Sequence, residues 1–197
     1  MKFNEEKIKG FENKKYKLNK KEKLKKFQEE EKKALQFMQT GEFDKAESIY
    51  KKLIRQKHIN YIILNNQAAI LGIKKKEDEM MNLLNKSIKI HPNNPEAYNN
   101  MGTFYENKGE IKLAINSYKK AISFINNDPS LYFNLGNALK KDRNNKEAIE
   151  SYKIAIKLKP NYIAALNNLG NILNEEKQYH PAIKHLKEAI ILNSNDP

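Results

Sequence analysis

The stretch LNNLGN at residues 166–171 decides the fold, because its pattern returns upstream at one fixed distance. The chain reads FNLGN at residues 133–137 and NNMGT at residues 99–103. The glycines of the three stretches fall 34 residues apart, at Gly102, Gly136 and Gly170. A period of this length is the signature of a repeat architecture, in which each unit packs mainly on its neighbours.

Other residues repeat in the same frame as the glycines. Two alanine positions follow it, one at Ala114, Ala148 and Ala182, the other at Ala121, Ala155 and Ala189. Isoleucine recurs once per unit, at Ile54, Ile88, Ile122, Ile156 and Ile190. Without any insertion or deletion, this frame divides the chain into five units: 27–60, 61–94, 95–128, 129–162 and 163–196.

Each unit has the pattern of two helices, as the third unit shows. Pro95 and Glu96 suit the start of a first helix, where N–H groups are unpaired and the helix dipole favours an acid. An apolar stripe at spacings of three and four follows, and residues 108–110 provide a turn. The second helix has its own stripe and ends at residues 126–129, where the next unit begins. One such hairpin cannot bury its apolar face alone, so stacking must stabilise the chain.

The unit resembles the tetratricopeptide repeat over residues 27 to 196. The fourth unit carries the family's pattern of aromatic, Leu-Gly, alanine and proline residues, at Tyr132, Leu135, Gly136, Ala148, Tyr152, Ala155 and Pro160. The resemblance implies an all-α fold, a right-handed superhelical solenoid of five helix-turn-helix units. Departures gather at the start, with Glu30, Lys33 and His58 in the first unit and Met80 and Ser87 in the second.

The two ends of the array give separate expectations. Residues 1–26 form a basic tail with eleven lysines and four glutamates; we expect residues 1–19 to be mostly disordered and residues 20–39 to form a long capping helix. At the other end, no solvating helix follows the last unit before Pro197, so Leu186 and Ile190 would face water. We therefore expect a longer array, a partner, or self-association through the last unit.

Amino-acid composition and net charge limit where the protein acts and which partners it binds. The chain has no cysteine, no stretch suited to a secretory signal and no run of about 18 apolar residues, so we expect a soluble, cytoplasmic protein without membrane insertion. The net charge of +13 would suit nucleic acid or an anionic surface, but a solvated, lysine-rich tail explains it as well. Nucleic acid is disfavoured because the expected groove positions are not basic and the aromatic residues occupy packing positions.

No motif for catalysis or cofactor binding is present. The four histidines, His58, His91, His180 and His185, lack the spacing of metal ligands. Phosphate-binding loops and nucleophile motifs are also absent from the sequence. We therefore expect no enzyme activity, no cofactor and no metal.

The family resemblance implies that the first helices line a concave groove, where ligand contacts come from fixed positions. Position six carries an asparagine in four units, and positions five and nine add further amides. The predicted peptide-binding residues are Asn66, Asn100, Asn134, Asn168, Asn99, Asn137, Asn167 and Asn171. A clamp for acidic C-termini is not expected, because only Lys32 supplies a cation at these positions.

The position-six asparagines are similar to the asparagine ladder in the repeats of the protein O-GlcNAc transferase family. An amide side chain offers a donor and an acceptor, so it can bind the backbone of an extended peptide whatever its sequence. With inner helices about 10 Å apart and about 3.3 Å per peptide residue, one asparagine would hold about every third residue. The alternative is that these asparagines only hold water.

Two functions follow from these observations. The first is a non-catalytic protein–protein interaction scaffold that binds an extended peptide segment in the concave groove. The alternative is the substrate-recognition repeat arm of a larger glycosyl- or sulfotransferase. Binding of RNA or an anionic surface through the basic tail is a third, less favoured reading.

Overall fold

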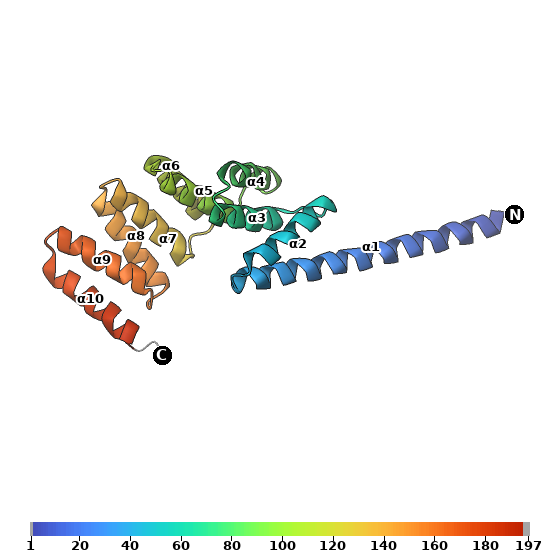
Figure 1. The fold of residues 1–197 in the computed structure, drawn as a ribbon. Coiled ribbons are helices and arrows are strands. Elements are labelled where there is room, and N and C mark those ends of the chain that lie inside the picture. The colour runs from blue at the N-terminus through green and yellow to red at the C-terminus, as the bar shows by residue number, and fades with distance from the viewer. Residues whose placement is uncertain (1, 195–197) are drawn as a thin grey trace.

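Ten α-helices stack as antiparallel pairs in the part of the chain that the computed structural model describes, which is the backbone of residues 2–194 and the side chains of residues 20–194 (Figure 1). The described residues contain no strand, so the predicted all-α solenoid is confirmed. The helices are α1 (Lys2–Gln39), α2 (Phe43–Arg55), α3 (Tyr61–Ile73), α4 (Glu77–Ile90), α5 (Pro95–Asn107), α6 (Ile111–Phe124), α7 (Pro129–Lys141), α8 (Asn145–Leu158), α9 (Ile163–Glu175) and α10 (Tyr179–Ser194).

Helix starts follow the frame of the repeat. α3, α5, α7 and α9 begin at Tyr61, Pro95, Pro129 and Ile163, which are the first residues of the proposed second to fifth units. These bounds support the division into five units, which we keep as a proposal; residue 196, the end of the fifth unit, lies outside the described residues. The backbone of residues 2–19 continues α1, whereas the sequence predicted disorder there. Lysine and glutamate are good helix formers, and no proline interrupts this segment.

Side chains cap three of the first helices. The carboxamide oxygens of Asn60 and Asn94 accept hydrogen bonds from the backbone N–H groups of Ile63 (2.8 Å) and Ala97 (3.1 Å). Asp128 accepts from the N–H of Ser130 at 2.8 Å. Each cap satisfies an N–H group that has no partner within the helix, and so it fixes where each unit begins.

The turn between the two helices of a unit uses the left-handed conformation at one repeat position. Only Gly41 and Gly109 supply glycine there, with φ of 75° and 77°. The other units place lysine or arginine in the same conformation, at Lys75, Arg143 and Lys177. A residue with a Cβ atom in this region costs about 1–2 kcal/mol, so three of the five turns carry backbone strain.

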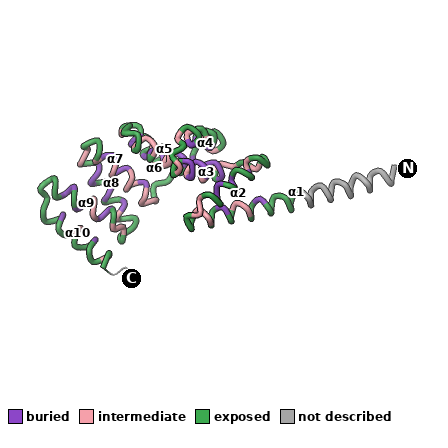
Figure 2. Tube along the Cα trace, in the orientation of Figure 1, coloured by how far each residue is buried: buried purple, intermediate pink, exposed green. Residues whose placement is uncertain are grey.

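The recurring glycine leaves room for a side chain of the second helix to pack against the first helix. A Cβ atom on Gly136 would lie 2.6 Å from Cε1 of Tyr152, and one on Gly102 would lie 2.5 Å from Cε1 of Tyr118. Both rings are buried, as are the repeated alanines of the second helices. In Figure 2, purple segments of buried residues alternate with exposed ones along the paired helices. The close approach of the paired helices therefore requires glycine at these positions for steric reasons.

The apolar surface of the last helix has no neighbour in the described chain. Ile183 and Ile190 are 52% and 66% exposed, whereas Ile149, which corresponds to Ile183 in α8, is 8% exposed against α9. Leu186 was also expected to face water, but it is only partly exposed because its side chain packs on Gly170.

Candidate functional site

The predicted position-six asparagines lie on successive first helices, one each on α3, α5, α7 and α9. All four are partly buried: Asn66, Asn100, Asn134 and Asn168. Three of them donate their amide N–H to a side chain of the preceding unit. Asn66 donates to the hydroxyl of Tyr50 at 3.0 Å, Asn134 to Oδ1 of Asn99 at 3.0 Å, and Asn168 to Oδ1 of Asn137 at 2.8 Å.

These bonds give the asparagines a structural role that sequence reasoning did not predict. Each joins two stacked units: Asn134 and Asn168 link neighbouring first helices, and Asn66 links α3 to the second helix α2. The Oδ1 atom of Asn137 accepts two hydrogen bonds, because the hydroxyl of Tyr152 also donates to it at 2.8 Å. Burial raises the pKa of Tyr152 to about 12, so this hydroxyl keeps its proton and remains a donor at neutral pH.

Asn100 differs from the other three because none of the equivalent acceptors is available to it. The preceding unit has Leu84 where Tyr50 and Tyr152 stand in other units, so no hydroxyl is present. Of the other two equivalents, Ala69 has no acceptor in its side chain and Asn65 is already paired with Asn94. Within residues 20–194 the side chain of Asn100 therefore makes no hydrogen bond that meets ordinary geometry, and its donor and acceptor remain available to a ligand.

Asn65 and Asn94 form a buried reciprocal pair behind the groove. Asn65 donates to Oδ1 of Asn94 at 2.9 Å, and Asn94 donates back to Oδ1 of Asn65 at 3.3 Å. Asn94 also donates to Oγ of Ser87 at 2.8 Å, and Ser87 donates to the carbonyl of Tyr61 at 3.0 Å. The one sequence feature that pointed to this network is Ser87, a serine at a repeat position that is alanine in the third to fifth units.

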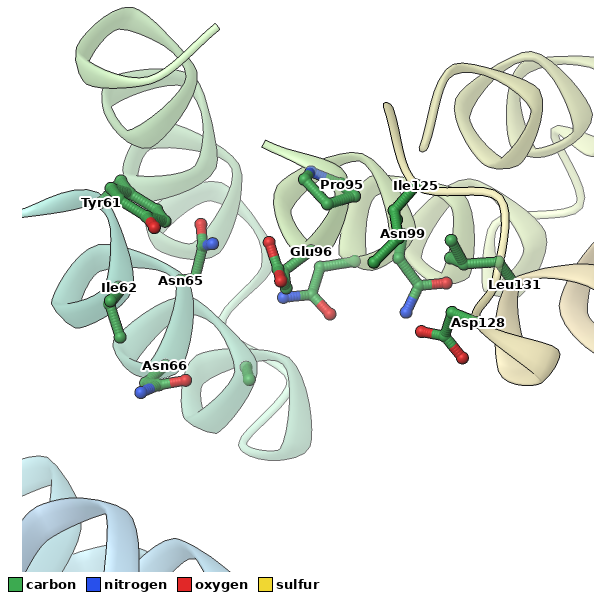
Figure 3. Close-up of a pocket in the computed structure, with 12 residues that line it drawn as sticks. Tyr61, Ile62, Asn65, Asn66, Pro95, Glu96, Asn99, Ile125, Asp128 and Leu131 are labelled. Carbon is green, nitrogen blue, oxygen red and sulfur yellow. The ribbon is translucent and has the colours of Figure 1, made fainter. Parts of the chain in front are cut away.

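A pocket of about 440 Å³ lies at the centre of the proposed groove (Figure 3). Tyr61, Asn65 and Asn66 of α3 line one side, and Ile125 and Asp128 before α7 line the other, with α5 between them. The full lining is Tyr61, Ile62, Asn65, Asn66, Ala69, Pro95, Glu96, Asn99, Asn100, Ile125, Asp128 and Leu131.

The pocket gathers some of the predicted binding residues and not others. It brings together Asn66, Asn99 and Asn100 from two adjacent units. The remaining five predicted residues lie farther along the chain and do not line it: Asn134, Asn137, Asn167, Asn168 and Asn171. Asn167 is partly buried and Asn171 is exposed. Sequence reasoning did not predict that Glu96 and Asp128 line the pocket. Glu96 is the second residue of α5, and Asp128 is the N-cap of α7.

Apart from Glu96, the charged side chains of α5, α7 and α9 are paired. Glu106 contacts Lys141 at 2.7 Å and accepts from the hydroxyl of Tyr118 at 2.9 Å, and burial raises the pKa of that hydroxyl. Glu175 contacts Lys140 at 2.8 Å. In the first unit, Glu31 contacts His58 and accepts from Asn60 at 3.2 Å.

The histidines have packing roles in the described structure. His58 stacks on Phe27 with ring centroids 4.4 Å apart, and His91 meets Tyr61 edge-on at 4.5 Å. His185 lies 3.8 Å from Glu188, and burial lowers its pKa. Among the described side chains, no three His, Cys, Asp or Glu residues converge as a metal site would require. No helix described over residues 2–194 has the length and apolar character that a membrane crossing demands.

Sequence models of one repeat family match most of the second half of the chain. Three models described as tetratricopeptide repeats match residues 83–116, 129–162 and 163–193, and one described as a TPR repeat matches residues 105–142. No curated protein matches the sequence.

Several solved structures have a fold similar to this one. A crystal structure of MamA is 23% identical with a TM-score of 0.69, covering 82% of this chain and 94% of MamA. Residues 41 to the end of MamA from Desulfovibrio magneticus RS-1 are 20% identical with a TM-score of 0.71, covering 87% of this chain and 97% of that one. YrrB, described as a TPR protein with an unusual peptide-binding site, is 18% identical with a TM-score of 0.64, covering 85% of this chain and 86% of YrrB. At these identities the likeness shows the fold.

Proposed function

This chain belongs to the tetratricopeptide repeat family, and on that premise we propose that it is a non-catalytic interaction scaffold that binds an extended peptide in its concave groove. The pocket between α3, α5 and the start of α7 is the centre of the proposed site. Its amide and apolar lining suits a peptide, because amides bind the backbone and apolar side chains cover the ligand's aliphatic carbons.

The observation that carries this proposal is the unengaged amide of Asn100 in the pocket wall. Asn66, Asn134 and Asn168 already donate one N–H each to a neighbouring unit. Each keeps a carbonyl oxygen that accepts no bond from the described side chains, whereas Asn100 keeps both functions. We therefore propose a modified ladder, in which Asn100 makes the full donor–acceptor contact with the peptide backbone and the other asparagines contribute acceptors.

A selection from random peptides tests this function. The full chain is immobilised, peptides of about nine residues are selected from a display library, and the affinity of one enriched peptide is measured by fluorescence anisotropy. Asn100→Ala should weaken binding by about five- to tenfold, because one or two hydrogen bonds of about 0.5–1.5 kcal/mol are lost. Asn116→Ala, on the exposed surface of α6, is the matched control and should leave affinity unchanged. Equal affinities for the two variants would show that the side chain of Asn100 does not contribute to peptide binding.

A second interaction surface is proposed on α10, where apolar residues are exposed. Ile183, Ile190 and Ile191 are 52%, 66% and 59% exposed. In the preceding unit Ile149 and Ile156, which correspond to Ile183 and Ile190, are buried and partly buried, so this part of the surface suits another helix. We propose that a second copy of the chain covers it, α10 against α10, because such a symmetric contact pairs like surfaces and closes.

A further inference from the structure

The charge in the groove pocket is opposite in sign to the charge of the chain. The sequence has a net charge of +13, yet the residues that line the pocket include two carboxylates, Glu96 and Asp128, and no lysine, arginine or histidine. A local negative site in a basic protein needs an explanation, because the surrounding cations would be expected to enter it.

These two acids also differ from the other acids of α5 and α9 and from Glu31 of α1. Glu31, Glu106 and Glu175 each have a cationic or protonatable partner from within the chain: His58, Lys141 and Lys140 respectively. Glu96 and Asp128 form no ion pair with the described side chains. Asp128 uses Oδ1 to accept from the N–H and the hydroxyl of Ser130, which leaves its second carboxylate oxygen to the pocket.

Helix capping explains part of this arrangement but not all of it. Asp128 caps α7, and asparagine does the same at Asn60 and Asn94, so the cap itself does not need a charge. Glu96 is the second residue of α5, where an acid interacts well with the helix dipole. The other four units have Gln28, Ile62, Ser130 and Ala164 at that position. The fold therefore does not require either negative charge.

Apolar side chains stand beside the two carboxylates. Ile62 and Ile125 are 47% and 37% exposed, and Tyr61 lies next to them in the pocket wall. Lysine and arginine bury their aliphatic carbons along apolar surface while the charged end reaches a polar group. The pocket volume of about 440 Å³ exceeds what a single side chain of this size fills, so the peptide backbone also fits beside Asn99 and Asn100.

We propose that this pocket selects a lysine or arginine side chain of the bound peptide, with Glu96 and Asp128 as its anionic partners. The proposal rests on the function proposed above, and it names the chemistry of the partner: an extended protein segment with a basic residue beside apolar ones. The site reverses the charge of the clamp that binds acidic C-termini, which needs lysine and arginine in its groove.

Parallel peptide selections test the proposal. A random nonapeptide library is selected on the full-length chain and on Glu96→Gln/Asp128→Asn, both at about 0.15 M salt. These substitutions keep the shape of each side chain, and asparagine retains the cap of α7. Glu150→Gln/Glu175→Gln is the control, because it removes the same charge from two acids that already contact Lys153 and Lys140. The urea midpoints of all three proteins are compared to exclude unfolding.

We expect lysine or arginine at one fixed position of the peptides enriched by the unmodified chain. Long-range attraction to a protein of charge +13 favours acidic peptides, so such enrichment must come from a local site. Replacing that residue by glutamine should weaken binding about five- to tenfold, in line with two ion pairs at partly exposed positions. This difference should fall to within about twofold on Glu96→Gln/Asp128→Asn and persist on the control variant.

The outcomes separate this inference from the proposed function. Enriched peptides without a fixed basic residue, or with a basic preference that survives Glu96→Gln/Asp128→Asn, would overturn the inference and leave groove binding intact. A preference lost equally on the control variant would also overturn it, because it would then report total charge. If no peptide is enriched, both the inference and the proposed function are wrong.

Discussion

Asn168 donates its side-chain amide to Oδ1 of Asn137 at 2.8 Å, and this bond joins the fifth unit to the fourth. The same oxygen accepts the hydroxyl of Tyr152, so a first helix, its partner helix and the next first helix meet at one atom. An asparagine at this position therefore stabilises the stack whether or not a ligand is bound, and ladder residues must be tested for stability as well as for binding.

Asn168→Ala should lower the free energy of unfolding, and Asn100→Ala should not. Removing Asn168 breaks one partly buried hydrogen bond between units, which corresponds to about 1 kcal/mol. Asn100 makes no such bond to the described chain, so its removal should change stability by less than about 0.5 kcal/mol. Urea unfolding followed by circular dichroism measures both. A loss on Asn100→Ala as large as that on Asn168→Ala would contradict the division into bridging and unengaged asparagines.

Gly136→Ala should destabilise the fourth unit. The added methyl carbon would lie 2.6 Å from Cε1 of the Tyr152 ring, which is fully buried and cannot swing away. Overpacking of this kind costs about 1–3 kcal/mol. Gly72→Ala is the matched control, because its nearest neighbour is the flexible side chain of Met80 at 3.0 Å and alanine favours a helix. The explanation would be wrong if both variants lost stability equally.

Arg143→Gly should stabilise the chain, although it replaces a long side chain with none. Arg143 has φ of 61°, a conformation that costs a residue with a Cβ atom about 1–2 kcal/mol. Glycine relieves this strain but loses more entropy on folding, so the expected net gain is about 0.5 kcal/mol. Asp142→Gly, one residue earlier at φ of −77°, has no strain to relieve and should destabilise. Denaturation midpoints of the two variants should move in opposite directions.

The repeat architecture was predictable because its causes are local in sequence. Apolar spacing recurs every 34 residues, helix-starting prolines mark α5 and α7, and the glycine that accommodates Tyr118 or Tyr152 marks the third and fourth units. The left-handed conformation of Lys75 and Arg143 could have been predicted from the repeat frame, because these residues occupy the same position as Gly41 and Gly109. The sequence position of a turn does not show its φ angle unless glycine marks it.

The hydrogen bonds between units could not be predicted in the same way. Whether Asn134 reaches Asn99 depends on the distance and rotation between two neighbouring first helices, which no single unit encodes. The exception at Asn100 needs three facts together: Leu84 in place of tyrosine, Ala69 in place of asparagine, and Asn65 already paired with Asn94. The pocket acids were missed because Asp128 belongs to a connection between units rather than to a groove position.

Ile190→Lys should prevent self-association if α10 is an interface between two copies. Ile190 is 66% exposed on the outer surface of the last helix, and a lysine there would place two like charges in a symmetric contact. Light scattering after size exclusion should show a mass that rises with concentration for the unmodified chain and stays monomeric for the variant. Leu113→Lys, at a 45% exposed position on α6, is the control. A monomer at every concentration in the unmodified chain would reject this interface.

Acid should weaken the contact between the first two units through Glu47. Hydrogen bonds from Lys51 and Lys74 lower the pKa of this carboxyl from its usual 4.5 to about 2, and its side chain is only 10% exposed. Because the folded-state pKa lies below the unfolded one, the carboxylate stabilises the fold above about pH 4.5, and this contribution is lost as the pH falls toward 2.

The size of this effect is on the order of 3 kcal/mol, since the pKa falls from 4.5 to about 2 and each pKa unit corresponds to about 1.4 kcal/mol. Urea midpoints measured between pH 7 and pH 2.5 should therefore fall more steeply for the unmodified chain than for Glu47→Gln, which cannot titrate. Glu147→Gln provides the comparison, because Glu147 is 52% exposed beside Lys119 and should change the profile little. Parallel profiles for the unmodified chain and Glu47→Gln would show that this carboxylate does not couple the first two units.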